Sequence, residues 1–443
     1  MDIRKRLASQ SAIIFAARLF GAGLIFLAQA AIARIWGSAI LGEYLLIIAT
    51  VNLIAVVMPL GFETIGTYFA AEYRAKGEGR LLRGFISRAY AHVIVVSAIL
   101  FVAGYPVAGL FGEPGRILMS HWVPACLLAF GTAMVFVSGA LLVGLKRPFA
   151  GFFSDTIFRP LVVIAAFVIS LSAADHEAGF TVMMWLLSIG YAVIAAVQFS
   201  FVLKSVREMP LELPARPREW QRWWRFAMPW VVIALASDFF FDIDLLLLSG
   251  HLSHEELAIF GVCTRVFSLV SFGVASVYAV TLPDMFESEA VSDRAGFHRK
   301  IGDANLVAAG LSIVLFVIMA VVGPLALMLF GPPFQAGVGP LAVLCLALVV
   351  RSVFGPAALV LSVHDRPYAS LPAIGLGIIT LIFGNLTLVP HFGLMGAALA
   401  ALLSITVWSG AMWLTVLKGA KVDVSILARL KRAPSPVHVE SGI

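Results

Sequence analysis

Seven charged residues lie inside stretches of sequence that are otherwise apolar. They are Arg18, Glu63, Asp238, Asp242, Asp244, Arg265 and Arg351. A charge near the centre of a membrane helix costs about 2.5–3.5 kcal/mol on insertion scales, so such residues are normally retained for function or pairing. An arginine can grip an anionic group such as phosphate at two points. A desolvated carboxylate can hold a proton or a sodium ion, and the sequence does not distinguish these ions.

Depth within the predicted helices indicates which charges meet. Arg18 and Glu63 lie at similar heights on two neighbouring helices. Arg265 and Asp242 lie at matching heights on two others, and Asp238 is four residues from Asp242, on the same helix face. Two interpretations stay open at this point. The pairs are structural ion pairs, or the same groups line a functional cavity.

Arg351 has no acidic residue at its level and is the best candidate for a free cation inside the membrane. We therefore predict two sets of site residues. The candidate cationic cavity is Arg18, Arg265 and Arg351, and the candidate ion-pairing or coupling groups are Glu63, Asp238, Asp242 and Asp244.

The sequence predicts no catalytic residue, metal or cofactor. Cys126, Cys263 and Cys345 lie inside apolar runs and lack the spacing of a disulfide framework or a zinc site. The loops predicted on the outer side, such as 173–179 and 389–393, are too short to form a catalytic domain.

The elements that position these charges are membrane helices. Of 443 residues, 61% are hydrophobic and only 13% are charged, too few charges to cover a water-soluble domain of this length. We predict an all-α polytopic membrane protein with about twelve transmembrane helices. The spans fall near 11–35, 41–70, 85–109, 120–145, 157–173, 180–203, 226–249, 256–282, 303–329, 340–363, 368–389 and 392–417.

Basic residues set the predicted orientation. With both termini in the cytoplasm, most of the 31 Lys and Arg lie in cytoplasmic segments, whereas the outer loops hold only Arg116. This asymmetry follows the positive-inside rule, and it explains the net charge of +6 without a nucleic-acid partner. We expect a multi-pass protein of the cytoplasmic (inner) membrane.

Two halves of the chain repeat each other. Leu110-Phe111-Gly112 reappears as Leu329-Phe330-Gly331, and Arg147-Pro148-Phe149 reappears as Arg366-Pro367-Tyr368, at one constant offset. Six helices per half make the repeat parallel, which is typical of carriers that bind cargo between two lobes by alternating access. We predict an N-terminal lobe at 1–203, a linker at 204–225, a C-terminal lobe at 226–417 and a cytoplasmic tail at 418–443.

The linker is Pro-rich and ends in alternating Arg and Trp between Arg218 and Arg225. This composition predicts a short helix lying at headgroup level and joining the two halves. The end of the tail, 433–443, is predicted to be disordered.

Local motifs resemble one known family. The segments Leu41-Gly42-Glu43-Tyr44, Pro59–Thr64 and Phe69–Gly77 resemble the polysaccharide-flippase (O-antigen translocase-like) family of the multidrug/oligosaccharidyl-lipid/polysaccharide exporter superfamily. Asp244–Leu252 resembles that family's Asp-x-Leu-Leu-Leu-Gly stretch, although Leu245 replaces the usual basic residue, and Thr281–Met285 resembles its Leu-Phe-Pro motif.

The resemblance implies a flippase that moves an undecaprenyl-pyrophosphate-linked oligosaccharide to the outer leaflet during polysaccharide biosynthesis. It implies the lipid-linked saccharide, the bilayer, a polysaccharide polymerase and export proteins as partners. One alternative is an ion-coupled multidrug or organic-cation antiporter of the same superfamily, with a cavity dominated by carboxylates. The alternative of another class is a non-transporting membrane scaffold of an export complex. A major-facilitator carrier is disfavoured, because Glu72–Gly84 lacks that family's signature loop.

Overall fold

The structure is a computed structural model that describes residues 3–207, 219–290, 294–363 and 366–426. The described residues are almost entirely helical and contain no β-strand. They form two compact units. Unit 1 is Met1–Arg265, Pro324–Pro340 and Asn385–Ala397, and unit 2 is Val266–Gly323, Leu341–Gly384 and Ala398–Ile443.

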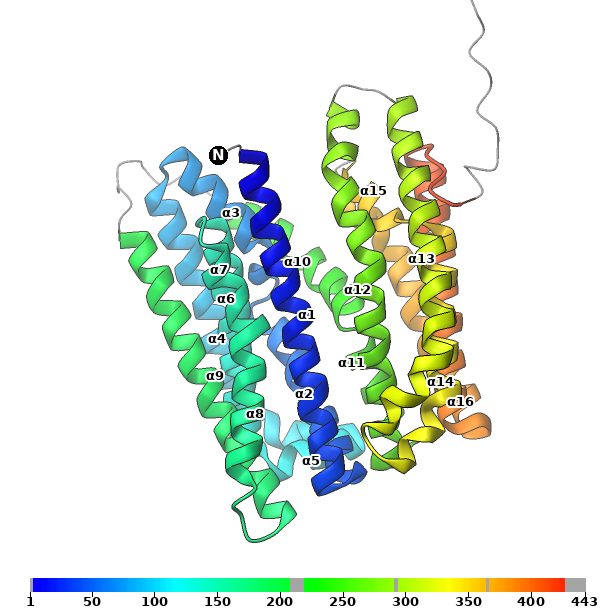
Figure 1. The fold of residues 1–443 in the computed structure, drawn as a ribbon. Helices are drawn as coiled ribbons and strands as arrows, with labels where there is room; N and C mark the ends of the chain where they lie inside the picture. The colour runs from blue at the N-terminus through cyan, green and yellow to red at the C-terminus, as the bar shows by residue number, and fades with distance from the viewer. Residues whose placement is uncertain (1–2, 208–218, 291–293, 364–365, 427–443) are drawn as a thin grey trace, which may run out of the picture. The chain divides into compact units, whose positions relative to one another are not determined.

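Unit 1 is built around helix α6, which packs against α2, α3, α4 and α9 (Figure 1). This helix is the apolar segment Trp122–Gly144, and most of its residues are buried, as expected for a helix that is hydrophobic on all sides. The helices of this part of the chain are α1 (Ile3–Trp36), α2 (Ser38–Val57), α3 (Phe62–Lys76), α4 (Gly79–Ala108), α5 (Gly112–Ser120), α6 (Trp122–Gly144), α7 (Pro148–Phe153), α8 (Arg159–Ser170), α9 (His176–Arg207), α10 (Glu219–Asp238) and α11 (Phe240–Leu248).

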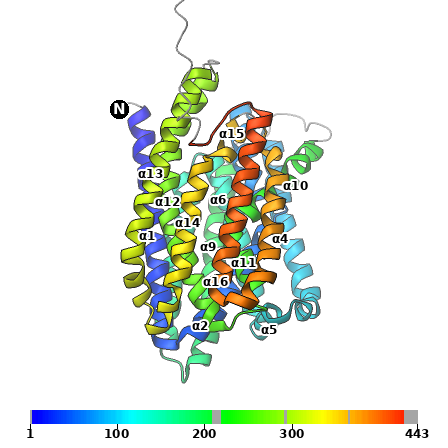
Figure 2. The ribbon, with the colours of Figure 1, turned by 90° about the vertical axis from the view of Figure 1, so that its right-hand side faces the viewer.

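Long helices make up unit 2, and Figure 2 shows α13, α14 and α16 running nearly parallel. The remaining helices of the chain are α12 (His254–Ala290), α13 (Arg294–Met328), α14 (Val338–Phe354), α15 (Ala357–Val363) and α16 (Leu371–Gly419). Helix α16 has a non-helical residue at Gly393 (φ 53°), so it consists of two helices joined at a kink.

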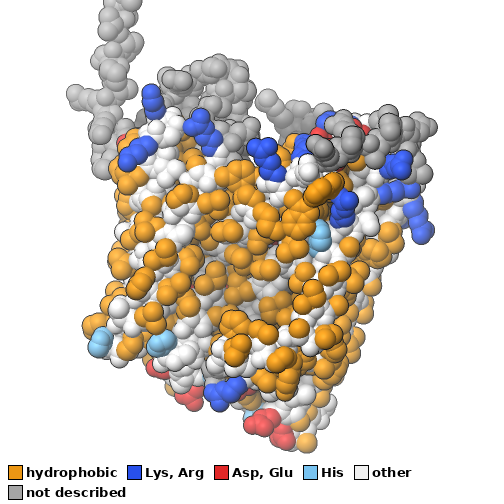
Figure 3. Space-filling view, turned by 180° about the vertical axis from the view of Figure 1, so that it is seen from behind, with side chains coloured by type: hydrophobic (Ala, Val, Ile, Leu, Met, Phe, Trp, Pro, Cys, Tyr) orange, Lys and Arg blue, Asp and Glu red, His pale blue; other side chains and the backbone are white. Residues whose placement is uncertain are grey.

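Ten helices of the described residues are long and apolar enough to cross a membrane. Two features reconcile this count with the predicted twelve. The predicted spans 368–389 and 392–417 are joined across the kink at Gly393, and the predicted span 226–249 is divided between α10 and α11. Figure 3 shows hydrophobic side chains covering the sides of the helices, with most of the visible Lys and Arg near one end.

The predicted second span, 41–70, is broken at Leu60 and Gly61. Both residues have positive φ, 53° and 83°, and they separate α2 from α3. A Cβ at position 61 would lie 2.3 Å from the backbone oxygen of Ala227 on α10. Glycine is therefore required here by the backbone conformation and by the close approach of a second helix.

The two repeated motifs share some features of backbone conformation. Gly112 and Gly331 both have positive φ, 63° and 123°. The amide of Arg147 donates to the carbonyl of Leu142 and the amide of Arg366 to that of Leu361, each at 2.8 Å, and each arginine precedes a proline that starts a helical turn. The shared local geometry agrees with duplication of an ancestral half.

The Arg/Trp segment differs from its prediction. Residues 219–225 are the first turns of the continuous helix α10, so they do not form a separate helix at the headgroups. Arg222 pairs with both oxygens of Glu72 on α3, at 3.2 and 2.8 Å, and Trp223 is buried and donates to the Tyr73 hydroxyl at 2.6 Å. The Pro-rich part of the linker, 208–218, lies outside the described residues.

Part of the predicted cytoplasmic tail, 418–443, is packed in the structure. Residues 420–426 fold back onto unit 2, and Val424 is completely buried. The stretch predicted to be disordered, 433–443, lies outside the described residues.

Candidate functional site

Asn52 on α2 joins charged groups from two other helices in the interior of unit 1. Its Nδ2 donates to Asp242 Oδ2 on α11 at 3.1 Å, and its Oδ1 accepts from Arg159 Nη2 on α8 at 3.1 Å. Asn52 and Asp242 are buried. Because each side of the amide is matched to a group of the required type, the asparagine fixes the positions of a cation and an anion together.

A π-helical turn, Ser154–Phe158, positions Arg159. This turn connects α7 to α8 and places Arg159 midway along the membrane-length segment Pro148–Ser170. The turn packs closely on α1, since a Cβ at Gly21 would lie 1.7 Å from the carbonyl oxygen of Thr156. Arg159 Nη1 donates to Asp155 Oδ1 at 3.0 Å, and its guanidinium lies 5.3 Å from the centre of the Tyr191 ring.

Asp242 also contacts Arg265 on α12, with 3.7 Å between Oδ1 and Nη2. The predicted meeting of these two residues is therefore observed. The separation is too long for a hydrogen bond, so the ion pair leaves the N–H donors of Arg265 unused by Asp242. Asp242 contacts Arg265 and is linked through Asn52 to Arg159, so the two guanidinium groups lie in one region.

Asp244 forms a second buried polar pair, with Asn385 on α16. Asn385 Nδ2 donates to Asp244 Oδ1 at 2.7 Å, and the two residues are 2% and 0% exposed. The other carboxylate oxygen, Oδ2, and the amide oxygen of Asn385 have no partner among the described residues. Two acceptors facing no donor are suited to a proton or a small cation.

The predicted Arg18–Glu63 pair is not formed. Glu63 is buried and accepts from the Thr64 hydroxyl at 3.0 Å, while its Oε2 has no partner among the described residues. The guanidinium of Arg18 lies 4.9 Å from the centre of the Phe152 ring. Asp238 is exposed on α10, and the charge of Arg18 acts on it electrostatically.

Arg351 belongs to unit 2, in the last turn of α14. Its side chain is exposed, and within the described part of the chain it forms no hydrogen bond or ion pair. Tyr278 on α12 lies within electrostatic range of it.

Sequence reasoning missed Arg159 and Asn52. Arg159 stood at the edge of the predicted fifth span, because the π-turn that extends this helix toward Pro148 leaves no hydropathy signal of its own. Asn52 is a single amide in an apolar run. Its two hydrogen-bond partners lie 107 and 190 positions away along the chain, so the sequence near Asn52 does not indicate them. The available signal was that both are strongly polar residues inside apolar stretches.

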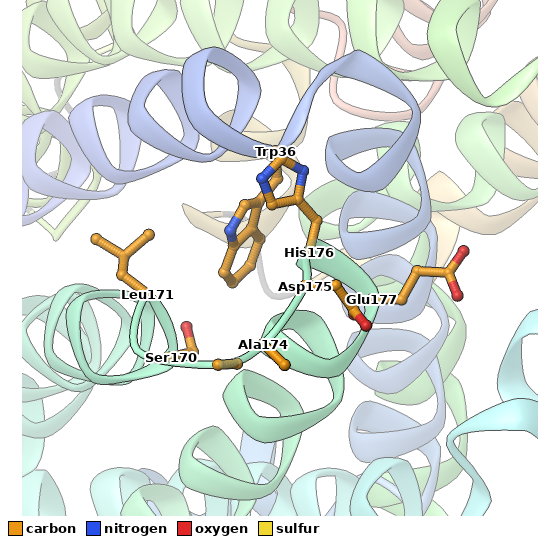
Figure 4. Close-up of a pocket in the computed structure, with 8 residues that line it drawn as sticks. Trp36, Ser170, Leu171, Ala174, Asp175, His176 and Glu177 are labelled. Carbon is orange, nitrogen blue, oxygen red and sulfur yellow. The ribbon is translucent and has the colours of Figure 1, made fainter.

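A separate pocket of about 580 Å³ lies in unit 1 between the end of α1 and the α8–α9 connection (Figure 4). Trp36 and the segment 170–177 line it. Trp36 is buried against Phe167, and Asp175 accepts from the amide of Ala178 as the cap of α9. The lining residues thus hold local structure, and none belongs to the polar groups around Asn52.

Comparison with known proteins gives similarity at the level of structure. No model of a protein family matches the chain, and no curated protein matches its sequence. An inward-facing multidrug resistance MATE family transporter of the MOP superfamily superposes with a TM-score of 0.75 at 13% identity, over 95% of this chain and 100% of that chain. The lipid II flippase MurJ, in an inward closed conformation, superposes with a TM-score of 0.74 at 15% identity, over 95% and 91%.

The MATE transporter VcmN of Vibrio cholerae, in its bent form, superposes with a TM-score of 0.60 at 16% identity, over 94% of this chain and 98% of that chain. At these low identities, the superpositions show similarity of fold alone. The chain has the two-lobed, helical fold of MATE and MurJ transporters.

Proposed function

We propose that this protein is a flippase that moves an undecaprenyl-pyrophosphate-linked oligosaccharide across the cytoplasmic membrane by alternating access, as part of polysaccharide biosynthesis. The observation that carries this proposal is that two arginines inside the membrane, Arg265 and Arg351, donate no hydrogen bond to any described residue. Guanidinium groups with unused donors in a low-dielectric region need an anionic acceptor, and a pyrophosphate supplies one.

The exposure of Arg351 supports a water-filled path. An exposed arginine at membrane depth that faced lipid would cost several kcal/mol, whereas one that faces a hydrated cavity does not. Moving two negatively charged phosphates into the low dielectric of the membrane also costs free energy. Fixed cations along the path lower this barrier. In this proposal Arg18, Arg159, Arg265 and Arg351 contribute the cations.

Asp244 is the group that we assign to ion coupling. It is fully buried, and one of its oxygens faces no donor of the described residues. A proton or sodium ion bound there would link an ion gradient to the conformation of α11 and α16. The lysine and arginine distribution supports both termini in the cytoplasm. The polymerase and export proteins are the partners that a flippase on this biosynthetic route would need.

The second candidate is an ion-coupled multidrug or organic-cation antiporter. Two buried carboxylates with an oxygen that lacks a described partner, those of Glu63 and Asp244, favour it, because a cation would satisfy both. The fold is equally compatible with it, since the similar structures include MATE multidrug transporters.

Reconstitution in proteoliposomes separates the two candidates. The first assay follows a fluorescent undecaprenyl-pyrophosphate-linked oligosaccharide between leaflets, for the wild type, Arg265→Ala and Arg351→Ala at matched protein content. Losing a charge-assisted contact should slow translocation by about 10- to 100-fold. Arg225→Ala removes an exposed cytoplasmic charge of α10 and serves as the control.

The second assay follows ethidium efflux under a proton or sodium gradient, with Asp244→Asn as the variant. Ethidium efflux that needs Asp244, together with no translocation of the lipid-linked saccharide, would replace the flippase with the antiporter. Translocation that responds to a gradient in the wild type and loses this response in Asp244→Asn would support both the flippase and its coupling group.

A further inference from the structure

The segment that follows α16, residues 420–426, is bound tightly into unit 2, and we call it the C-terminal strap. Val422, Val424 and Ser425 are buried, at 5%, 0% and 4% exposure. The two valines join a hydrophobic core with buried residues from three helices, among them Ile301, Ala357 and Val416. A terminal segment that served only as a connection would not bury its side chains so completely.

One carboxylate sets the shape of the strap. Asp423 Oδ1 accepts from Trp413 Nε1 on α16 at 2.9 Å, from the amide of Ser425 at 3.0 Å and from the Ser425 hydroxyl at 2.7 Å. The bonds to Ser425 form a tight turn, and the bond to Trp413 fastens this turn to the preceding helix.

The strap donates a backbone hydrogen bond to the end of α14, where the helix is broken. This helix ends at Phe354 because Gly355 adopts a φ of +81°, and the break leaves carbonyls of the last turn without helical partners. The amide of Ile426 donates to one of them, that of Val353, at 3.0 Å. A Cβ at position 355 would lie 1.9 Å from the carbonyl oxygen of Val424, so strap and break fit only with glycine there.

A chain of hydrogen bonds leads from the strap toward Arg351. The carbonyl of Val424 accepts from Asn305 Nδ2 at 3.0 Å, and Asn305 Oδ1 accepts from the Tyr278 hydroxyl at 2.8 Å. Asn305 is completely buried on α13. Tyr278 lies within electrostatic range of Arg351, whose carbonyl accepts from the amide of Gly355 at 3.3 Å.

We infer that the C-terminal strap is a positioning element for Arg351, acting through Asn305 and Tyr278 on one side and through the last turn of α14 on the other. This inference rests on the proposed function, in which Arg351 meets the anionic group of the substrate. An exposed arginine with no described ion partner has many rotamers, and a fixed helix end beneath it reduces the entropy lost when it binds. Tyr278, Asn305 and Asp423 are then positioning residues, and Arg351 is the residue that touches substrate.

A double-mutant cycle in the full-length protein tests this inference. Tyr278→Phe removes only one hydroxyl, so it should fold, and folding is checked by gel filtration and thermal unfolding. The assay is translocation of the fluorescent undecaprenyl-pyrophosphate-linked oligosaccharide, read as KM and maximal rate. In the wild-type background Tyr278→Phe should reduce the rate at low substrate about fivefold, the factor typical of one neutral hydrogen bond, mainly by raising KM.

In the Arg351→Ala background the same change should have almost no effect, because its target is gone. Asp423→Asn, which keeps an acceptor oxygen for Trp413 and Ser425, should behave as wild type, whereas Asp423→Ala should resemble Tyr278→Phe. Ser404→Ala is the matched control. It removes another buried bond of unit 2, the 2.7 Å bond to the Gly377 carbonyl, and should act equally in both backgrounds.

Equal factors for Tyr278→Phe in both backgrounds would overturn the inference and make the strap a purely structural closure. Normal kinetics of folded Tyr278→Phe and Asp423→Ala would overturn it as well. Failure of the proposed function gives a different pattern, because Arg351→Ala would then itself translocate at the wild-type rate.

Discussion

Asn52 and Asp242 lie 190 positions apart in the sequence, and yet the amide of one donates to the carboxylate of the other at 3.1 Å. The same amide accepts from Arg159 at 3.1 Å. The neutral amide of Asn52 therefore lies between the carboxylate of Asp242 and the guanidinium of Arg159, and it holds the two charges apart. Arg159 pairs with a different carboxylate, that of Asp155, at 3.0 Å.

Replacing Asn52 should cost stability. Asn52→Leu leaves Asp242 and Arg159 each one partner short, and an unsatisfied buried polar group costs about 1–3 kcal/mol. We expect a clear fall in the midpoint of thermal unfolding in detergent. Gln29→Leu is the control, because Gln29 is equally buried and its Oε1 has no partner among the described residues. Equal falls for the two variants would show that the bonds of Asn52 carry no special weight.

Variants of Asp242 and Arg265 can distinguish a structural ion pair from a role in translocation. Arg265→Ala leaves a buried carboxylate less neutralised and should lower stability by about 3–5 kcal/mol if the pair is structural. The double variant Asp242→Asn/Arg265→Ala should recover most of that stability. Translocation of the lipid-linked saccharide should stay low in it, because the donor is still missing. If translocation returns together with stability, Arg265 is only a structural partner.

The contact of α10 with α3 should depend on pH in a defined direction. Burial raises the pKa of Glu72, but its hydrogen bonds and the charges of Arg222 and Lys76 outweigh this and hold the pKa below the ordinary value of 4.5. A lowered folded-state pKa means that ionised Glu72 stabilises the fold above about pH 4.5 and that this contribution is lost as pH falls through the folded pKa.

Thermal unfolding of the wild type and Glu72→Gln across pH checks this. The wild type should be more stable at pH 7, by about 1 kcal/mol or less for a pair near the surface, and the difference should shrink at low pH. In the Arg222→Gln background most of the difference should be absent at every pH. A difference that grows as the pH falls would contradict the assigned sign.

Gly61 should tolerate substitution far less well than Gly77. Both have positive φ, 83° and 70°, so alanine strains the backbone at each position by about 1 kcal/mol. Only at Gly61 would the added Cβ also collide, 2.3 Å from the Ala227 carbonyl oxygen, while nothing lies within 4 Å at Gly77. Expression and unfolding midpoints of the two alanine variants give the comparison. Equal losses would mean that α10 moves aside without cost.

Much of the fold could be predicted from the sequence, because span length and hydropathy report directly on the bilayer. The repeat could be predicted from paired motifs such as Leu-Phe-Gly, whereas the break at Leu60 and Gly61 interrupts a span that was predicted to be continuous. The strap could not be predicted. Its valines and Asp423 form a pattern only against residues of other helices, and a short segment after the last span reads as a tail.

The candidate site was predictable in part. The contact between Asp242 and Arg265 was correctly predicted from their equal depth, since helix rise fixes height along a span. Arg18 and Glu63 form no pair despite their similar depth, because height does not specify which faces of two helices meet, and Arg18 lies over Phe152. Arg351 was predicted without an acidic partner and lacks an ion pair among the described residues. The roles of all these residues in transport stay predictions.

The π-turn at Ser154–Phe158 makes the site sensitive to chain length as well as to residue type. One residue subtends about 100° of an α-helix, so a single-codon deletion in this turn would swing Arg159 away from Asn52 without altering any residue of the site. Deep scanning of one-residue deletions should therefore find this turn intolerant, while deletions in the α8–α9 connection should be accepted. In homologous chains that differ by one residue here, the arginine of α8 would meet a different neighbour, although the arginine itself is retained.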